Sequence, residues 1–299
     1  MTKTRSRRKH NTPEIKNLII VSDMHIGSRL GLFPSGYKMP LDDGGAYTAS
    51  RLQRVTWSWW KEFWNEWVPQ VTRDEPYAVV LNGDIVDGGA HHGNTVHISA
   101  NMEDQVELAL HVLEPIAARA SRLYVVRGTE VHGGISGHVE ESIARQLNAA
   151  PDRDGKFSRW RLRLRLGYGL IDIAHHIGTT GSMAYETSAI HKELEQIYAD
   201  AARWGEEPPD VVVRSHRHTC AETRIRIYKR RHGARAQGFA TSCTTAGWQL
   251  ATPFAYRVAG ARRMRPQFGG TLVRCGDEEV YTRHWVRSIE PAPIEEVRL

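Results

Sequence analysis

Short apolar segments alternate along the chain with longer stretches of helical periodicity. Five apolar segments have the length of buried strands, and polar residues end or follow each of them, at 18–21, 77–84, 122–132, 168–176 and 209–218. Helical patterns, with apolar residues three or four positions apart, occupy 49–68, 100–120 and 184–204. This alternation predicts an α/β protein with a largely buried central sheet.

One helical stretch is rich in tryptophan. Between residues 49 and 68, one face of the expected helix carries Trp57, Trp60, Trp64 and Trp67, which are three or four positions apart. Such a face either packs against the hydrophobic core or forms a platform on which bases stack. We interpret it as core, because an apolar stripe on a helix is more often buried than functional.

The composition is that of a globular protein with a sizeable core. Of the 299 residues, 40% are hydrophobic and 25% are charged, and the formal net charge of +6 favours an acidic partner. Residues 1–16 are basic and almost without apolar side chains, so we expect a disordered tail followed by one domain at 17–299. No apolar run is long enough for a membrane span, no secretory signal is recognisable, and the three cysteines lack disulfide or zinc spacing. We therefore expect a cytoplasmic protein without a membrane partner.

The polar residues at the ends of the five apolar segments are of the types that bind divalent metals. They are Asp23 and His25; Asp84 and Asp87; Glu130 and His132; His175 and His176; and His216 and His218. Ligands bind outside the carboxyl ends of strands in open α/β sheets, so we expect these residues to meet at one site. The spacing of two positions, as in Asp23 and His25, predicts side chains on one side of an extended segment.

The number of such residues predicts two metal ions. Six or seven ligands are too many for one tetrahedral ion but suit a pair of ions about 3.5–4 Å apart. A two-metal centre polarises a phosphoryl oxygen and lowers the pKa of a bridging water, which makes hydrolysis of a phosphoester the natural chemistry. The chain contains neither a P-loop nor a G-x-S-x-G nucleophile motif, which disfavours a covalent serine mechanism. We expect manganese as the cofactor, with iron, zinc or nickel as alternatives.

Taken together, these motifs resemble those of the calcineurin-like metallophosphoesterases. The family's D-x-H, G-D-x-x-D, G-N-H-D/E, lone His and G-H-x-H motifs have counterparts here, in the same order and spacing, in DMH (23–25), GDIVD (83–87), GTEVH (128–132), AHH (174–176) and SHRH (215–218). The segments RGTEVHGG and TTAGWQLATPFAYRV are similar to the phage and prophage branch of the family, which implies a bacterial or phage-infected cytoplasm. The resemblance implies two mixed β-sheets packed face to face and flanked by helices.

The resemblance also implies the metal ligands. Asp84 is expected to bridge the two ions, His175 and His216 to bind one of them, and three residues to bind the other: Asp23, His25 and His218. His175 is preferred to the adjacent His176 because the family places its ligand directly at the strand end. His176 is then expected to contact the substrate or to support a ligand.

The third motif departs from the family pattern. The family's asparagine ligand falls on Thr129, whose hydroxyl is a poor metal ligand, and its catalytic histidine falls on Glu130. We predict that Glu130 binds the second ion, with Asn94 or His92 as alternative ligands. His132 is then the catalytic acid that protonates the leaving oxygen, because the pKa of an imidazole lies near neutral pH. The alternative is a loop histidine that touches only Glu130 or solvent.

The loop that follows the second apolar segment contains several histidines. Its sequence, DGGAHHGNTVH (87–97), places His91, His92 and His97 close along the chain to Asp84. These side chains either contact the substrate at the rim of the site or belong to a polar, glycine-rich turn.

The excess of basic residues is concentrated in two predicted strands. In RWRLRLRLG (159–167), arginines alternate with apolar residues, so that Arg161 and Arg163 lie on the polar side of a half-buried strand. A second basic segment, RIRIYKRRHGARAQ (224–237), contains a probable hairpin. These arginines either bind the phosphates of a nucleic acid or form a solvated face that protects a sheet edge.

The function that we predict is hydrolysis of phosphoester bonds by a dinuclear metal centre. A phosphodiesterase or nuclease is favoured, because the basic surface suits DNA or RNA as a substrate. The alternatives are a phosphomonoesterase or protein phosphatase, and a non-catalytic interaction protein on the same fold. Protein partners are left open.

Overall fold

The computed structural model describes most of the chain, namely residues 15–41, 43–89, 96–178, 185–231, 234–252 and 265–289. The predicted basic tail at 1–16 lies almost wholly outside the described residues. Among the helices of the described ranges, none combines the length and the apolar character that crossing a membrane requires.

The first sheet contains six strands in the described part of the chain, in the order β13-β12-β1-β4-β5-β6. Their bounds are β1 Asn17–Val21, β4 Tyr77–Asn82, β5 Arg122–Val126, β6 Ser158–Arg159, β12 Gln267–Cys275 and β13 Val280–Ser288. β1, β4, β5 and β6 run parallel to one another, and β12 and β13 extend the sheet as an antiparallel pair beside β1. The sheet is therefore mixed.

The second sheet contains five described strands in the order β10-β11-β9-β8-β7. Their bounds are β7 Arg161–Leu166, β8 Gly169–Ala174, β9 Val211–Arg214, β10 Ala221–Arg231 and β11 Ala234–Thr244. β8, β9 and β11 are parallel, whereas β7 and β10 are antiparallel edge strands. The hairpin predicted in the second basic segment is present as β10 and β11.

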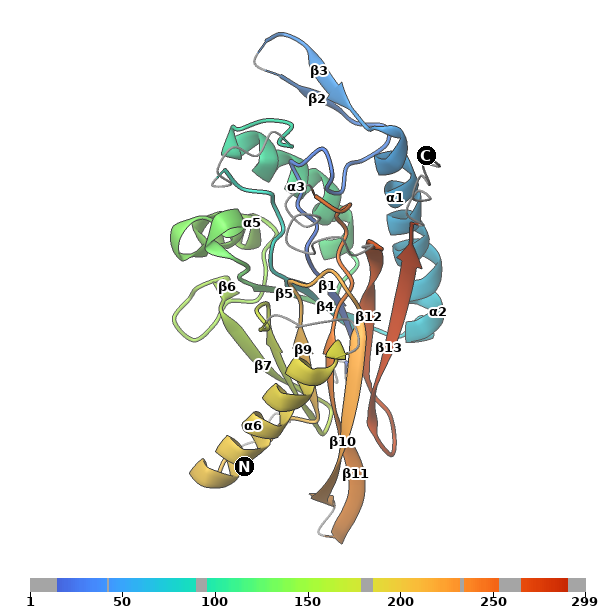
Figure 1. The fold of residues 1–299 in the computed structure, drawn as a ribbon, viewed down its shortest axis with the longest axis vertical. Coiled ribbons are helices and arrows are strands. Elements are labelled where there is room, and N and C mark those ends of the chain that lie inside the picture. Colours follow the sequence, from blue (N-terminus) through green and yellow to red (C-terminus); the bar gives the residue numbers. More distant parts are fainter. Residues whose placement is uncertain are drawn as a thin grey trace, which may run out of the picture.

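The two sheets pack face to face between two layers of helices (Figure 1). Leu18 and Ile20 of β1 share a buried cluster with Ile171 and Val213 of the second sheet. The outer face of the first sheet is covered by α1 Arg51–Glu62, the π-helical turn η1 Phe63–Trp67, α2 Val68–Thr72, α3 Met102–Ala117 and α5 His138–Gln146. α6 Ser188–Trp204 covers the second sheet through Leu194. The predicted fold class, two mixed sheets packed face to face and flanked by helices, is confirmed.

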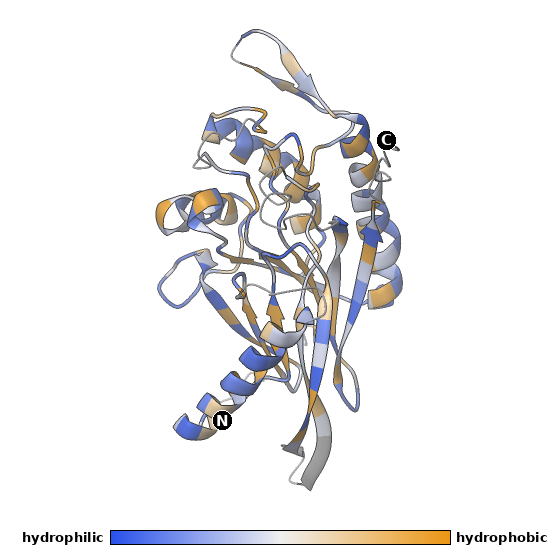
Figure 2. Ribbon diagram, in the orientation of Figure 1, coloured by the Kyte–Doolittle hydropathy of each residue, from blue (hydrophilic) through white to orange (hydrophobic). Residues whose placement is uncertain are grey.

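Hydropathy follows these layers (Figure 2). The strands at the centre of the molecule are mostly hydrophobic, and α6 is largely hydrophilic. The tryptophan-rich stretch belongs to the core, as we interpreted it. Trp60 and Trp64 are buried and contact each other at a ring-centroid distance of 5.6 Å, and Trp60 also contacts Trp248.

Shorter elements complete the described chain. A small hairpin, β2 Lys38–Pro40 with β3 Ala46–Thr48, extends from the end of the molecule near α1 (Figure 1). A short helix, α4 Glu130–Gly133, and the 3₁₀ turn η2 Ile135–Gly137 lie between β5 and α5. The third sequence motif, at 128–132, comprises the turn before α4 and the first residues of that helix.

Candidate metal centre

The loops that follow β1, β4, β5, β8 and β9 meet at one edge of the sandwich. Backbone N–H groups of Asp23 and His25 donate to the carbonyl oxygens of Gly83 at 3.0 Å and Asp84 at 3.1 Å, which joins the loops after β1 and β4. The N–H of Ser215 donates to the carbonyl oxygen of His175 at 2.9 Å, which joins the loops after β8 and β9. Each loop leaves the carboxyl end of a strand in a parallel pair, which is where ligand sites form in α/β sheets. The convergence expected from the strand ends is therefore present.

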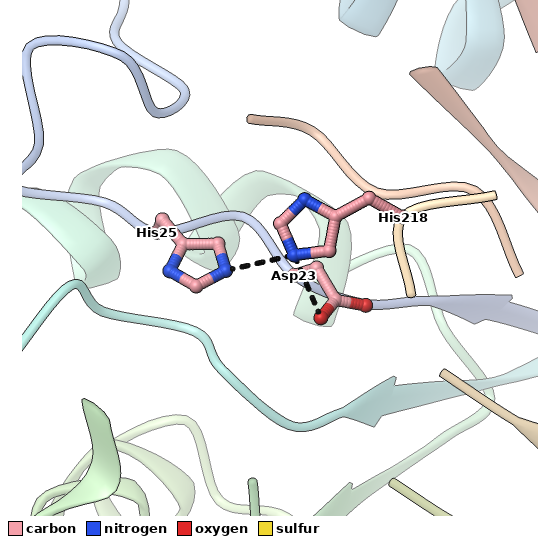
Figure 3. Close-up of side chains that lie close together, drawn as sticks. All are labelled: Asp23, His25 and His218. Atoms are coloured by element: carbon pink, nitrogen blue, oxygen red, sulfur yellow. Dashed lines mark hydrogen bonds and ion pairs between the residues drawn. The ribbon is translucent and has the colours of Figure 1, made fainter. Parts of the chain in front are cut away.

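A first group of side chains comprises Asp23, His25 and His218 (Figure 3). The Nε2 atoms of His25 and His218 are 3.2 Å apart, and His218 Nε2 is 3.3 Å from Asp23 Oδ1. Asp23 and His25 are buried, whereas His218 is partly exposed. The three side chains come from two loops and point toward a common position.

A second group comprises Asp84, His175 and His216. Asp84 Oδ2 lies 3.0 Å from His175 Nε2 and 3.9 Å from His216 Nδ1. The Nδ1–H of His175 donates to the carbonyl oxygen of Asn82 at 2.7 Å, since a carbonyl can only accept. This contact leaves Nε2 as the atom of His175 that faces the carboxylates.

The two groups adjoin each other. His175 Nε2 is 3.8 Å from Asp23 Oδ1, so a ligand atom of one group lies against a ligand atom of the other. Asp84 also forms a third group with His25 and His132. Asp84 and His25 thus each belong to two of the three groups, and the third group connects the first to the second.

The loops at the centre have unusual backbone geometry. A left-handed φ is found at five predicted ligands, which are Asp23, His25, Asp84, His216 and His218. Such a φ costs energy in residues other than glycine and tends to persist at functional sites. It also corrects one expectation, because Asp23 and His25 do not lie on an extended segment. Tight turns after the strand, rather than the alternation of a strand, bring their side chains together.

Asp84 is held from behind by the loop after β5. Its Oδ1 accepts hydrogen bonds from the backbone N–H of Thr129 at 2.7 Å and from the Thr129 hydroxyl at 3.0 Å. A Cβ atom at Gly128 would lie 2.2 Å from the same oxygen, so this close approach requires glycine. These contacts orient Oδ2 toward His175 and give Thr129 a positioning role that the sequence motifs did not indicate.

A buried carboxyl lies beneath this loop. Glu140, in the first turn of α5, is fully buried, and its Oε2 accepts from the N–H of Gly128 at 2.7 Å. Burial and then the nearby carboxylate of Asp84 raise the pKa of Glu140 to about 7. The sequence does not identify Glu140 as part of the site. An acidic side chain is common in the first turn of any helix, because the helix dipole stabilises a negative charge there.

Asp87 and His97 support His25. Asp87 Oδ1 lies 3.5 Å from His25 Nδ1, and Asp87 Oδ2 lies 2.9 Å from His97 Nε2. A carboxylate behind an imidazole fixes the ring orientation of a metal-binding histidine. Asp87 was identified at a strand end but without a role, and His97 was considered only as a contact at the rim or as part of a polar turn.

The charges of the centre are strongly coupled. Burial lowers the pKa of His175, but the carboxylates of Asp84 and Asp23 outweigh it and raise the pKa to about 10. Burial raises the pKa of Asp23, but His218 and His175 outweigh it and lower the pKa to about 2. The pKa of Asp84 is likewise well below its ordinary value, because His175 outweighs the effect of burial. Burial and then His132 lower the pKa of His25 to about 4.

This arrangement fits divalent cations. Asp23 Oδ1 is buried without a hydrogen-bond partner among the described residues, although His175 and His218 approach it. Two imidazole nitrogens 3.2 Å apart, as in His25 and His218, need a proton or a cation between them. Ionised carboxylates beside imidazoles form a donor set that suits divalent ions such as manganese, iron, zinc and nickel.

The third motif is arranged differently from our expectation. Glu130 is exposed as the first residue of α4, and the structure does not bring it into any of the three groups. His132 is buried, with its ring centroid 4.4 Å from that of His25. The segment is a helical turn, so residues two positions apart point about 200° away from each other around its axis. This is why His132 alone faces the centre.

The other predicted residues lie at or beyond the rim. His176 is exposed beside the second group, with its ring centroid 5.1 Å from that of His216. His91 and His92, and the alternative ligand Asn94, lie outside the described residues.

The basic edge strand is ion-paired within the chain. β7 shows the predicted alternation, with exposed arginines and leucines that are buried or partly buried. Arg161 Nη2 lies 2.6 Å from Asp172 Oδ2, and Arg163 Nη1 lies 3.1 Å from Glu206 Oε2. Asp172 is fully buried and also pairs with Arg214. Phosphate groups would therefore have to compete with carboxylates of the protein for these two arginines.

A scan against protein-family models and a search of curated proteins give no match for this chain. Among solved structures, the chain is similar to vacuolar protein sorting 29 from Cryptosporidium parvum, with 12% identity, a TM-score of 0.35, and 92% of this chain and 98% of that chain covered. It is also similar to the Thermotoga maritima protein TM1076, with 12% identity, a TM-score of 0.33, and 92% of this chain and 100% of that chain covered. At such low TM-scores neither likeness bears on function, which is left to the residues of the site.

Proposed function

We propose that the protein hydrolyses phosphoester bonds at a dinuclear metal centre. The observation that carries this proposal is the pair of adjoining ligand groups, three residues in each, with Asp84 shared between the second and third groups. In this proposal Asp84 lies between the two ions, His175 and His216 hold one of them, and the other is held by Asp23, His25 and His218. Phosphodiesters are favoured over monoesters because an exposed aromatic side chain, Trp160, lies against Arg127, the residue that immediately precedes the Gly128–Thr129 turn, and could contact a second ester group.

The protein's own side chains have separable roles in such a reaction. Two divalent ions, when bound, supply a Lewis acid for the phosphoryl oxygens and lower the pKa of a water. Thr129 and Asp87 hold Asp84 and His25 in place. The Nδ1–H of His132 donates to the carbonyl oxygen of Asp87 at 2.6 Å, which assigns proton transfer to Nε2. We propose that this atom protonates the leaving oxygen.

The proposed function is tested with two generic esters. Protein stripped by a chelator and reloaded with Mn²⁺, Fe²⁺, Zn²⁺ or Ni²⁺ is assayed on bis(p-nitrophenyl) phosphate and on p-nitrophenyl phosphate. We expect hydrolysis that disappears on chelation and returns with metal, and that is faster on the diester. Two bound ions per chain without turnover of either ester would instead favour a non-catalytic binding protein, and a preference for the monoester would favour a phosphatase.

Metal binding is expected to release protons. The pKa of His175 is about 10 in the absence of metal, so its imidazole is protonated at pH 7 and must lose that proton before Nε2 binds a cation. Metal affinity should therefore rise with pH, by up to about tenfold per unit between about pH 7 and pH 10. Titration calorimetry at pH 7 in HEPES and in Tris, whose ionisation enthalpies differ, measures the number of protons released. We expect about one proton from His175.

The control for this experiment is the neighbouring histidine. His176 is exposed and lies outside the ligand groups, so His176→Asn should leave proton release unchanged. An observed enthalpy that does not depend on the buffer would show that no proton leaves, and would contradict the role given to His175.

A further inference from the structure

An exposed tryptophan lies where the chain passes from one sheet to the other. Trp160 separates β6 of the first sheet from β7 of the second, and 47% of its surface is exposed. The guanidinium carbon of Arg127 lies 5.5 Å from the centroid of its ring. Single exposed apolar side chains are common and by themselves indicate nothing. The position of Trp160 relative to the metal centre is what indicates a function for this side chain.

Both neighbours of Trp160 lead directly to the candidate metal centre. Arg127, against its ring, immediately precedes the Gly128–Thr129 turn that holds Asp84. Arg161, the next residue along the chain, pairs in register with Ala174, which immediately precedes His175. Trp160 thus lies between the end of β5, which is followed by the turn that holds Asp84, and the end of β8, which is followed by the proposed ligand His175.

Further apolar side chains are exposed on the short elements that follow Arg127 in the chain. Arg127 Nη1 donates to the carbonyl oxygen of Ser136 at 3.0 Å, which places η2 next to the Arg127–Trp160 pair. Ile135, in that turn, is 80% exposed, and Val131, which precedes the proposed acid His132, is 39% exposed. We call the exposed surface of Trp160, Val131 and Ile135 the Trp160 rim.

Arg127 serves this rim as a fixed support. Besides its bond to Ser136, its Nε donates to Ser158 Oγ at 2.8 Å, and its Nη2 lies 3.5 Å from Glu141 Oε2. A guanidinium held by three partners has little freedom to follow a phosphate. Its contact with Trp160 instead restrains the indole ring, which reduces the entropy that the ring loses when a ligand stacks on it.

We propose that the Trp160 rim binds a base of a single-stranded nucleic acid next to the scissile phosphate, by stacking on Trp160. This inference rests on the proposed function, because it supplies the substrate class for the same site. Stacking on an aromatic ring suits a base, and only an unpaired base has a face available for it. The formal net charge of +6 is compatible with a polyanionic ligand. Because Arg161 and Arg163 are paired with carboxylates, we expect stacking to carry more of the affinity than the basic strand does.

The test measures binding directly. Fluorescein-labelled pentathymidylate with phosphorothioate linkages, which slow cleavage, is titrated with the manganese-loaded full chain and followed by anisotropy. Trp160→Ala should weaken binding by about 5- to 150-fold, the range that the loss of one stacked base gives. Trp160→Phe should stay within a few-fold of the wild type, because an aromatic ring is retained. An abasic strand of the same length and linkage keeps the charges and lacks the bases, so Trp160→Ala should not change its binding.

A second tryptophan provides the matched control. Trp204 ends α6 and is 73% exposed, on the outer layer of the second sheet. Trp204→Ala should leave the affinity for pentathymidylate unchanged. Equal losses in Trp160→Ala and Trp204→Ala, an equal loss for the abasic strand, or no binding by the wild type would overturn the proposal.

Failure of this inference can be told apart from failure of the proposed function. If the protein hydrolyses bis(p-nitrophenyl) phosphate but Trp160→Ala leaves pentathymidylate binding unchanged, the hydrolase stands and the base site is wrong. If Trp160-dependent binding is found but neither ester nor an ordinary oligonucleotide is hydrolysed with any metal, the base site stands and the hydrolase is wrong.

Discussion

Asp84→Asn is expected to abolish turnover and to lower the occupancy of both metal ions. Asp84 Oδ2 lies 3.0 Å from His175 Nε2, at the junction of the ligand groups, and its pKa is well below the ordinary value. The asparagine keeps an oxygen that accepts from Thr129, so the loop after β5 retains its anchor. It removes one negative charge from between two dications, which is worth several kcal/mol of charge stabilisation, or at least about a thousandfold in rate.

Two measurements check this prediction. Elemental analysis after gel filtration gives ions per chain, and kcat/KM on bis(p-nitrophenyl) phosphate gives activity. Asp200→Asn is the matched control, because Asp200 is partly exposed on α6 and its side chain contacts Gln196 and Arg203 of the same helix. Asp84→Asn protein that keeps two ions and a near-normal rate would remove Asp84 from its proposed place between the ions.

The strands that carry the site could be predicted from the sequence because their signals are local. Each of β1, β4, β5, β8 and β9 is a largely apolar run, and polar residues follow it in the chain. The apolar run reflects burial of the strand, and the polar residues lie at its carboxyl end, where ligands bind in such sheets. The structure places these strands within one or two residues of the predicted starts. The polar residues that follow these strands could therefore be assigned to one site from the sequence alone.

The edge of the first sheet could not be predicted in the same way. β12 pairs antiparallel with β1, so that Thr271 lies opposite Ile20, although about 250 residues separate them in the chain. β12 contains two consecutive glycines, which weaken a strand signal, and its partner is chosen by long-range packing. The predicted helix at 49–68 was also only partly right. It exists, but a π-helical turn at Phe63–Trp67 interrupts it.

At the site, the types of residue were easier to predict than the directions in which their side chains point. The pairs Asp23/His25 and Glu130/His132 each have a spacing of two, which an extended chain would place on one side. The first pair converges because both residues adopt a left-handed φ, and the second diverges because it lies in a helical turn. Residues that position a loop, such as Glu140, cannot be recognised from sequence motifs, because their role depends on which loop packs against them in the folded chain.

A change at His132 is expected to slow catalysis while the metals remain bound, and a change at Glu130 is expected to do little. His132 is buried beside His25, and its Nδ1 is fixed by the carbonyl oxygen of Asp87. As the proposed acid, it contributes about 10²- to 10⁴-fold to the rate. Glu130 is exposed on the other side of the same helical turn, where substitutions usually have small effects.

The leaving group separates an acid from a ligand at His132. An acid matters most when the leaving oxygen is basic, so His132→Ala should slow the hydrolysis of methyl phenyl phosphate more than that of bis(p-nitrophenyl) phosphate. A metal ligand would affect both esters alike and would lower the metal content as well. We therefore expect His132→Ala to keep two ions per chain and to show a steeper dependence of rate on leaving-group pKa than the wild type.

Glu130→Ala serves as the control within the same turn, with metal content, rate and dependence on the leaving group all close to wild type. Metal loss in His132→Ala would make His132 a metal ligand, and metal loss in Glu130→Ala would restore the ligand role that the sequence first indicated for Glu130.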